Sequence, residues 1–328
     1  MPTTPEYGVD LITFYDPSFW GVNSYDEIME IRHKNPVQIW TTIFDALSEA
    51  GITAIEMTFP PADVSSALDA FGSAEGFKTE LQRRGLKLKS SFHMGSGWGP
   101  GGDRNAEVAK AVEHATFLAE AGGDTLVVGP PMRKSRDANP PLFIDHAFAS
   151  AVADTAHAVG NATLRLGVKT ALHTEAHSMF CTRRDIDLLL GLTDPEYVFF
   201  CPDTAHITLA GGNPIDAVVA HSERVVIAHW KDAVGPMPAG LPIEGEKIHE
   251  LHQGYMCTLG EGVVDWDRWI TLYDKTQGSD VRLLELDAVA DPIKEMKAAK
   301  AFVENASAQN AASGSSPGQA SQAHEKRS

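Results

Sequence analysis

The chain alternates between short apolar runs and longer segments in which apolar residues recur every three or four positions. The first pattern is typical of β-strands buried on both faces, and the second of amphipathic helices that cover a sheet. The apolar runs predict eight strands, at 8–15, 53–59, 86–93, 124–130, 166–175, 197–204, 224–230 and 281–287. Helical periodicity fills the intervals, and one such helix has Pro36 near its start and Gly51 at its end, as helices prefer.

A strand followed by a helix, repeated eight times, requires parallel strands. We therefore predict an α/β fold, a (β/α)8 TIM barrel formed as a single domain over residues 1–305. A doubly wound sheet is the alternative, but no GxGxxG motif follows the first expected strand. Residues 306–328 are small, polar and aperiodic, and we expect a disordered polar tail there.

The charge balance excludes some classes of partner. The chain has 27 Lys+Arg against 44 Asp+Glu, a net charge of −17, so we expect no nucleic-acid partner. This also argues against an abasic-site endonuclease of related fold. No apolar run reaches the roughly 18–20 residues that a bilayer-spanning helix needs, and the first residues do not look like a secretory signal. The cysteines, at 181, 201 and 257, are widely spaced, which suits a reducing compartment, so we expect a cytoplasmic protein without a membrane partner.

Ionisable side chains stand where the expected strands end, and in TIM barrels the catalytic residues come from the carboxyl ends of the strands. The third, fifth, sixth, seventh and eighth strands contribute His93, His173, Glu175, Asp203, His206, His229, Lys231, Asp232, Glu285 and Asp287. The connection at 234–280 is long, which is typical of a binding loop.

Four of these residues, Glu175, Asp203, His229 and Glu285, come from four consecutive strands. Three carboxylates and one imidazole make an oxygen-rich set that suits Mn²⁺ best, with Mg²⁺ or Co²⁺ as alternatives. A bound dication would also relieve the repulsion between converging carboxylates. Taken singly, each residue could instead cap a helix or form an ion pair.

The motifs "PDTAHITLAGGNP", "VVIAHWKDA", "LGEGVVDWD" and "LLELDAVADP" carry a resemblance to a known group. Over roughly residues 8–305 the chain resembles the sugar phosphate isomerase/epimerase superfamily of xylose-isomerase-like TIM barrels, and most of all its inosose-dehydratase type. The resemblance implies that the same four residues bind the metal and that His206 and Lys231 face the substrate.

Two further motifs, "ITFYDPSFWG" and "HTEAH", are similar to the catalytic α subunits of bacterial C-glycoside deglycosidases. That resemblance implies a 3-keto glycoside substrate and a small β subunit as partner. Inosose dehydratases commonly have His where Glu175 stands. The sequence therefore leaves two kinds of substrate as alternatives, a keto-inositol and another keto-sugar.

The expected chemistry is proton abstraction next to a ketone, with the dication stabilising the enediolate. Loss of a β-substituent would make the enzyme a lyase, by dehydration or by deglycosylation of a C-glycoside, and this is our leading prediction. Reprotonation would instead make it a ketose or keto-inositol isomerase or epimerase, for which Glu56 could supply a second acid–base group. A non-catalytic sugar-binding subunit is a further alternative.

The remaining candidate roles each have a structural alternative. His173 is predicted as the catalytic base, because it shares a strand face with Glu175, although it could simply orient that residue. His93 could also be the base. Lys231 could stabilise an oxyanion or form a salt bridge. The aromatic residues Trp20 and Trp98 are predicted to stack on a sugar ring, with core packing as the alternative.

Overall fold

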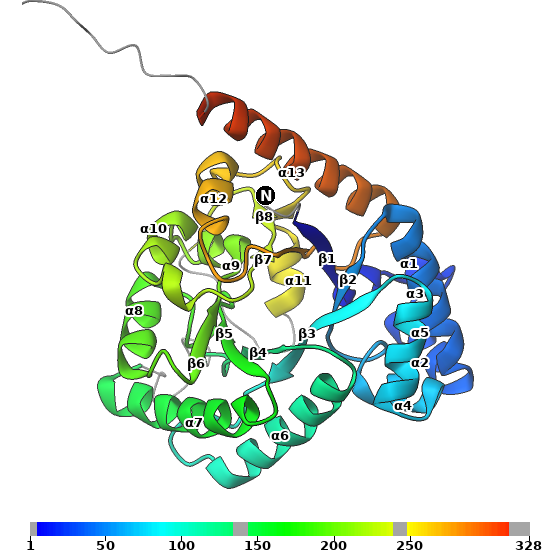
Figure 1. The fold of residues 1–328 in the computed structure, drawn as a ribbon. Helices are drawn as coiled ribbons and strands as arrows, with labels where there is room; N and C mark the ends of the chain where they lie inside the picture. The colour runs from blue at the N-terminus through cyan, green and yellow to red at the C-terminus, as the bar shows by residue number, and fades with distance from the viewer. Residues whose placement is uncertain (1–4, 134–143, 239–247, 315–328) are drawn as a thin grey trace, which may run out of the picture.

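The computed structural model describes residues 5–133, 144–238 and 248–314. Its strands form a curved, parallel eight-stranded sheet within these ranges, and the helices surround it (Figure 1). The strands are β1 (Glu6–Asp10), β2 (Ala54–Met57), β3 (Lys87–Met94), β4 (Thr125–Gly129), β5 (Lys169–His173), β6 (Val198–Cys201), β7 (His229–Trp230) and β10 (Val281–Leu284). Their order in the sheet is β6-β5-β4-β3-β2-β1-β10-β7. This confirms the predicted (β/α)8 barrel.

The barrel closes between β6 and β7, and we call this junction the seam. Two isolated parallel bridges join its sides, Phe200 with Val225 and Asp203 with His229. The His229 amide donates to the Pro202 carbonyl at 3.0 Å. The seam is thus held by isolated bridges rather than by a continuous ladder.

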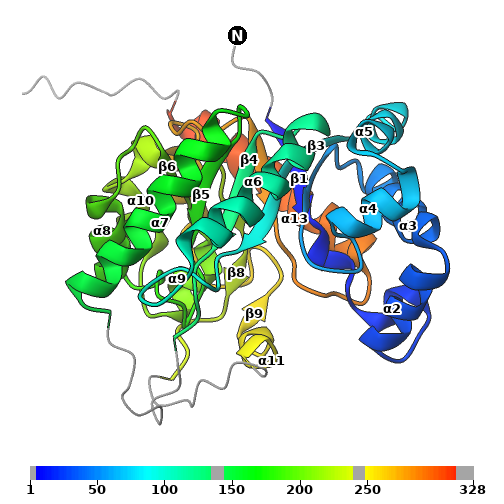
Figure 2. The same cartoon turned by 90° about the horizontal axis from the view of Figure 1, so that it is seen from below.

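The helices lie on the outside of the barrel, where their apolar faces cover the strands (Figure 2). Several begin at a polar cap; for example, Asn35 Oδ1 accepts from the Gln38 amide, and Asp103 Oδ1 from the Ala106 amide. They are α1 (Pro17–Trp20), α2 (Tyr25–Lys34), α3 (Pro36–Ala50), α4 (Val64–Phe71), α5 (Ala74–Arg83), α6 (Arg104–Glu120), α7 (His146–Leu164), α8 (Arg183–Leu192), α9 (Thr204–Leu209), α10 (Pro214–Val219), α12 (Trp266–Tyr273) and α13 (Pro292–Gly314). Among the described residues, none of these helices is long and apolar enough to cross a bilayer.

Two expectations are corrected at the ends of the barrel. The strand predicted at 8–15 stops at Asp10, whose Oδ1 accepts the Ile12 amide at 2.7 Å and starts a 3-10 helix (Leu11–Phe14). The disordered tail was predicted to begin at residue 306, but residues 306–314 are helical, because α13 continues to Gly314. Residues 315–328 lie outside the described ranges.

The long connection after β7 folds over the carboxyl end of the barrel. It contains the antiparallel pair β8 (Asp232–Ala233) and β9 (Met256–Cys257), and the helix α11 (Ile248–Gln253), which Figure 2 shows beyond that end. Asp232 Oδ2 holds this connection by accepting from the amides of Gly260 and Gly262 at 2.9 and 3.1 Å. The connection thereby brings α11 over the mouth of the barrel.

The side chains that face the barrel interior change from apolar to ionisable toward the carboxyl ends of the strands. A layer of buried apolar side chains fills its centre, including Ala54, Ala171, Ile227 and Leu283. Two residues further along the same strands, the inward positions are occupied by Glu56, His173, His229 and Glu285. Because alternate residues of a strand face the same side, the apolar layer ends where the ionisable layer begins.

Candidate metal centre and active site

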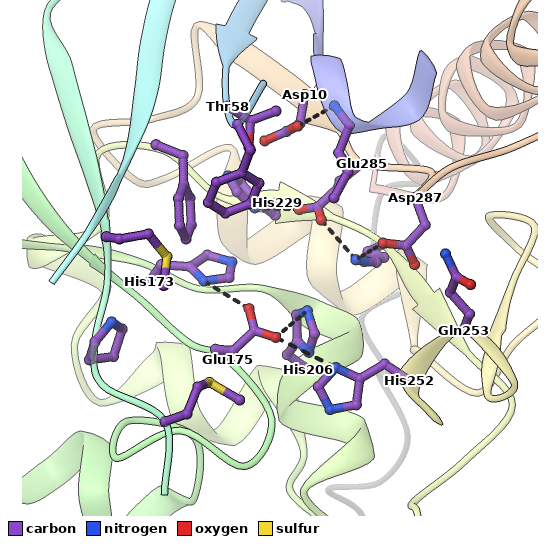
Figure 3. A pocket seen from close by; sticks show the side chains of 18 residues that line it. Asp10, Thr58, His173, Glu175, His206, His229, His252, Gln253, Glu285 and Asp287 are labelled. Atoms are coloured by element: carbon purple, nitrogen blue, oxygen red, sulfur yellow. Dashed lines mark hydrogen bonds and ion pairs between the residues drawn. The ribbon is translucent and has the colours of Figure 1, made fainter. Parts of the chain in front are cut away.

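A cavity of about 270 Å³ opens at the carboxyl ends of the strands (Figure 3). Its lining includes the ionisable side chains of His173, Glu175, His206, His229, Lys231 and Glu285. It also includes the apolar side chains of Ile12, Phe59, Phe92, Met94, Pro130 and Met132, and the Phe92 ring packs edge-on against the His173 ring, with the centroids 5.4 Å apart. The cavity can therefore contact both polar and apolar parts of a ligand.

Four ligand-type residues converge beside the cavity: His173, Asp203, His229 and Glu285. One donor atom from each lies within 4.8 Å of the others. Asp203 Oδ2 lies 3.7 Å from His173 Nε2 and 3.9 Å from His229 Nδ1. Glu285 Oε2 is 2.5 Å from His229 Nδ1, without the alignment of a hydrogen bond. We call these four the metal cluster.

The sequence places each member of the metal cluster by local rules. His173 ends β5, and His229 begins the two-residue strand β7. Asp203 is the N-cap of α9 through Oδ1, which accepts the His206 amide at 2.7 Å, so Oδ2 is left for the cluster. Asp203 can therefore cap the helix and bind a metal at the same time, because the cap uses only Oδ1 and a metal would use Oδ2.

The donor atoms of the metal cluster fit a divalent cation. Asp203 Oδ2, Glu285 Oε2 and both nitrogens of His173 are buried, and within the described chain none has a hydrogen-bond partner. Although burial opposes it, the charges of Lys231 and His229 hold the pKa of Glu285 well below its ordinary value. Burial, and next the charge of His229, lower the pKa of His173, so that this imidazole stays neutral. An ionised carboxylate and a neutral imidazole are the states that bind metals. His229 is the exception: although burial opposes it, Cys201, Glu56 and Glu285 raise its pKa well above the ordinary value, so a cation bound at its Nδ1 would displace a proton.

The structure places Glu175 outside the metal cluster, and His173 takes the position predicted for it. Strand β5 ends at His173, and in the turn that follows, Glu175 groups with His206 and His252 rather than with Asp203. Its Oε2 lies 3.7 Å from His173 Nδ1, and its Oε1 faces His206 and His252 (Figure 3). The cluster therefore contains two imidazoles and two carboxylates, a softer set than predicted.

Lys231 lies in the cavity, as predicted, and forms two ion pairs. Its Nζ is 2.8 Å from Glu285 Oε1 and 2.6 Å from Asp287 Oδ1. Although burial opposes it, Asp287 and Glu285 raise the pKa of Lys231 well above its ordinary value. A permanent positive charge thus stands beside the metal cluster.

Three predicted site residues do not line the cavity. His93 lies on the outer face of β3, between the inward Phe92 and the exposed Met94, and its Nδ1 is 3.3 Å from His114 Nδ1. The Trp98 side chain is buried in the core. The Trp20 indole donates to the Phe14 carbonyl at 2.6 Å. These positions correct the roles predicted for all three, since none of them is among the residues that line the cavity.

Two residues that line the cavity, Asp10 and His252, were not predicted from the sequence, and a third residue, Glu56, lies elsewhere than expected. Asp10 lines the cavity but was hidden inside the strand expected at 8–15. His252 reaches the cavity from α11, and only the length of its connection hinted at a functional loop. Glu56 was expected to face the substrate in an isomerase, but it lies behind the metal cluster, with its Oε1 2.9 Å from His229 Nε2.

Comparison with known proteins places the chain in a family. The model of the xylose isomerase-like TIM barrel family matches residues 44–306. The chain belongs to this family. The family assignment confirms the superfamily resemblance inferred from the sequence motifs.

Curated relatives within the xylose isomerase-like family include inosose dehydratases. The inosose dehydratase of Bacillus cereus (strain AH820) is 24% identical over 295 residues, which cover 81% of this chain and 93% of that protein. The inosose dehydratase of Bacillus thuringiensis (strain Al Hakam) is 25% identical over 294 residues, covering 80% and 93%.

Solved structures of the same fold are similar over almost the whole chain. The probable 3-DHS dehydratase AsbF from Bacillus anthracis has a TM-score of 0.66 at 15% identity, covering 92% of this chain and 99% of that one. The IolI protein with a bound zinc atom has a TM-score of 0.66 at 13% identity, covering 94% and 98%. An L-ribulose 3-epimerase reaches the same TM-score at 14% identity, covering 95% and 99%. At these identities the likeness concerns the fold.

Proposed function

We propose that this protein is a divalent-metal-dependent lyase that acts on a keto-sugar. The observation that carries the proposal is the metal cluster, His173, Asp203, His229 and Glu285, standing at the mouth of a cavity that can hold a sugar. The curated relatives named inosose dehydratases support elimination over isomerisation. The position of Glu56 behind His229 also disfavours an isomerase that would use it as a second acid–base group.

In this proposal the four residues of the metal cluster hold the cation. A cation bound there would act as a Lewis acid toward the ketone oxygen and so stabilise the charge that develops when the neighbouring C–H loses its proton. Two nitrogen and two oxygen donors suit Mn²⁺, Co²⁺ or Zn²⁺ better than Mg²⁺. Manganese stays a prediction.

Two side chains of the protein would stabilise the developing negative charge and transfer the proton. Lys231 would hold its ammonium group toward the substrate oxygen that becomes negative. Asp10 would transfer the proton, because it lines the cavity beside the metal cluster. Burial, and then the charges of Glu285 and Glu56, raise the pKa of Asp10 well above its ordinary value, which brings it closer to neutrality, where general acid–base groups work best. His173, predicted as the base, would instead bind the metal.

The apolar residues of the cavity lining bear on the leaving group. Phe59, Phe92 and Met132 line the cavity, and they would accommodate an apolar or aromatic substituent better than a hydroxyl group. This supports a 3-keto C-glycoside, whose aglycone leaves, over a keto-inositol, which loses water. The small β subunit implied by the sequence resemblance stays a prediction.

The test is an assay of the metal-loaded protein on matched keto-sugars, keto-inositols and 3-keto C-glycosides, with product masses as the readout. Loss of an aglycone or of water supports the lyase, whereas products of unchanged mass would make the protein an isomerase or epimerase. Exhaustive chelation should abolish turnover, and added Mn²⁺ should restore it.

Asp10→Asn should keep the metal yet lose exchange of the substrate proton with solvent deuterium. An Asp26→Asn variant, altered at an exposed residue of α2, is the matched control.

A further inference from the structure

Glu175 lies in a second group of ligand-type side chains beside the metal cluster. Its Oε1 is 3.4 Å from His206 Nε2 and 3.5 Å from His252 Nδ1 (Figure 3). One donor atom from each of these three residues lies within 4.8 Å of the others. The three side chains converge from different elements: the turn after β5, α9 and α11.

The spacing of these atoms fits a shared cation better than direct hydrogen bonds. Well-formed N–H···O bonds measure about 2.7–3.2 Å, and Glu175 Oε1 makes none in the part of the chain that the structure describes, although it is buried. Donors at about 2.0–2.2 Å from a tetrahedral ion lie about 3.3–3.6 Å from one another. The two distances from Glu175 Oε1 fall within that interval.

The ring of His252 is oriented as a metal-binding imidazole would be. Its Nε2 lies 3.0 Å from His177 Nδ1, and this contact leaves Nδ1 turned toward Glu175. Metal-binding histidines usually engage the second ring nitrogen in such a hydrogen bond, which fixes the tautomer and the ring plane. His177 adopts a positive φ of 64°, a conformation that is uncommon outside glycine and that a functional constraint on this contact would explain.

We propose that Glu175, His206 and His252 form a second divalent-cation site next to the metal cluster. Two imidazoles and one carboxylate leave coordination positions open, as in mononuclear sites for Zn²⁺, Co²⁺ or Fe²⁺. All three residues line the same cavity as the metal cluster, so a small anionic or hydroxylated ligand could contact both ions. The site does not depend on the lyase assignment, since it concerns ion binding alone.

The second ion should bind more weakly than the first. Glu175 Oε2 lies 3.7 Å from His173 Nδ1, so the two sites are neighbours and two dications in them would repel each other. A Co²⁺ titration should therefore show two steps, with the second at higher Co²⁺ concentration.

The test is the number of ions bound per full-length chain, measured by equilibrium dialysis against Co²⁺ and elemental analysis. We expect two ions in the unaltered protein and one in each of Glu175→Gln, His252→Ala and Asp203→Asn. The double variant Asp203→Asn with His252→Ala should bind none, and His33→Ala, altered at an exposed histidine of α2, should keep two. Circular dichroism would establish that each variant is folded. A single ion in the unaltered protein, or two ions in both Glu175→Gln and His252→Ala, would overturn the proposal.

Discussion

At the scale of single residues, Lys231 pairs with two of the carboxylates that line the cavity. Its ammonium group is buried and touches the carboxylates of Glu285 and Asp287. A buried carboxylate without a partner is costly, and removing one member of a buried ion pair typically costs about 3–5 kcal/mol. Lys231 should therefore contribute to stability as well as to chemistry.

We expect Lys231→Met to lower the free energy of unfolding by about 3 kcal/mol, since it leaves the buried carboxylate of Glu285 and the half-buried one of Asp287 without their cation. Urea denaturation of the metal-free protein would measure the loss. Lys34→Met is the matched control, because Lys34 pairs with Glu30 on the exposed surface of α2, and exposed pairs contribute about 1 kcal/mol or less. Equal effects of the two substitutions would contradict this role of Lys231.

Residue patterns located the candidate site well but did not resolve its geometry. Strand alternation predicted that Asp203, His229 and Glu285 converge, and the structure brings them together. It could not choose between His173 and Glu175, because positions two apart in a strand face the same side. The choice depends on the point at which β5 stops, and this is set by packing beyond the strand. The position of His252 could not be predicted either, because it depends on how the long connection after β7 packs against the rest of the barrel.

At the scale of elements, α13 extends into residues 306–314, for which composition alone predicted disorder. Residues 306–314 are small and polar, so they carry little amphipathic pattern, yet they continue the helix along the barrel. Ala306 is buried, Arg282 donates to Ser307 Oγ at 2.6 Å, and Asn310 donates to the Asp267 carbonyl at 2.9 Å. These contacts with distant parts of the chain hold the last turns of the helix, and they are invisible to local periodicity.

A chain ending at Asn305 should therefore be less stable than one ending at Gly314. The shorter chain loses two hydrogen bonds and a buried methyl group, so we expect a difference of about 1–3 kcal/mol in the free energy of unfolding. Guanidinium denaturation of the two truncated proteins would measure it. Coincident midpoints and slopes would show that residues 306–314 do not stabilise the barrel.

At the scale of the whole molecule, the metal cluster lies across the seam. Asp203 follows β6 and His229 opens β7, so a cation that binds both would connect the two sides where the ladder is reduced to isolated bridges. The other two ligands, on β5 and next to β10, extend this connection to the neighbouring strands. Metal binding should thus stabilise the closed barrel as a unit.

We expect saturating Mn²⁺ to raise the melting temperature by several degrees. A ligand at 100 times its Kd contributes about 2.7 kcal/mol to the folded state, which corresponds to roughly 4–6 °C in a protein of this size. Differential scanning calorimetry with and without Mn²⁺ would measure the rise. Asp203→Asn should remove most of it, and an undiminished rise in that variant would place the stabilising ion elsewhere.

The pairing of β1 has a consequence for synthesis on the ribosome. One edge of β1 pairs with β2, but the other pairs with β10, with Val9 opposite Leu284. At about 5–20 residues per second, the roughly 270 residues between these partners take some 15–55 s to be translated. Until then a nascent chain presents one unsatisfied strand edge, the kind of surface that chaperones bind and that invites premature association.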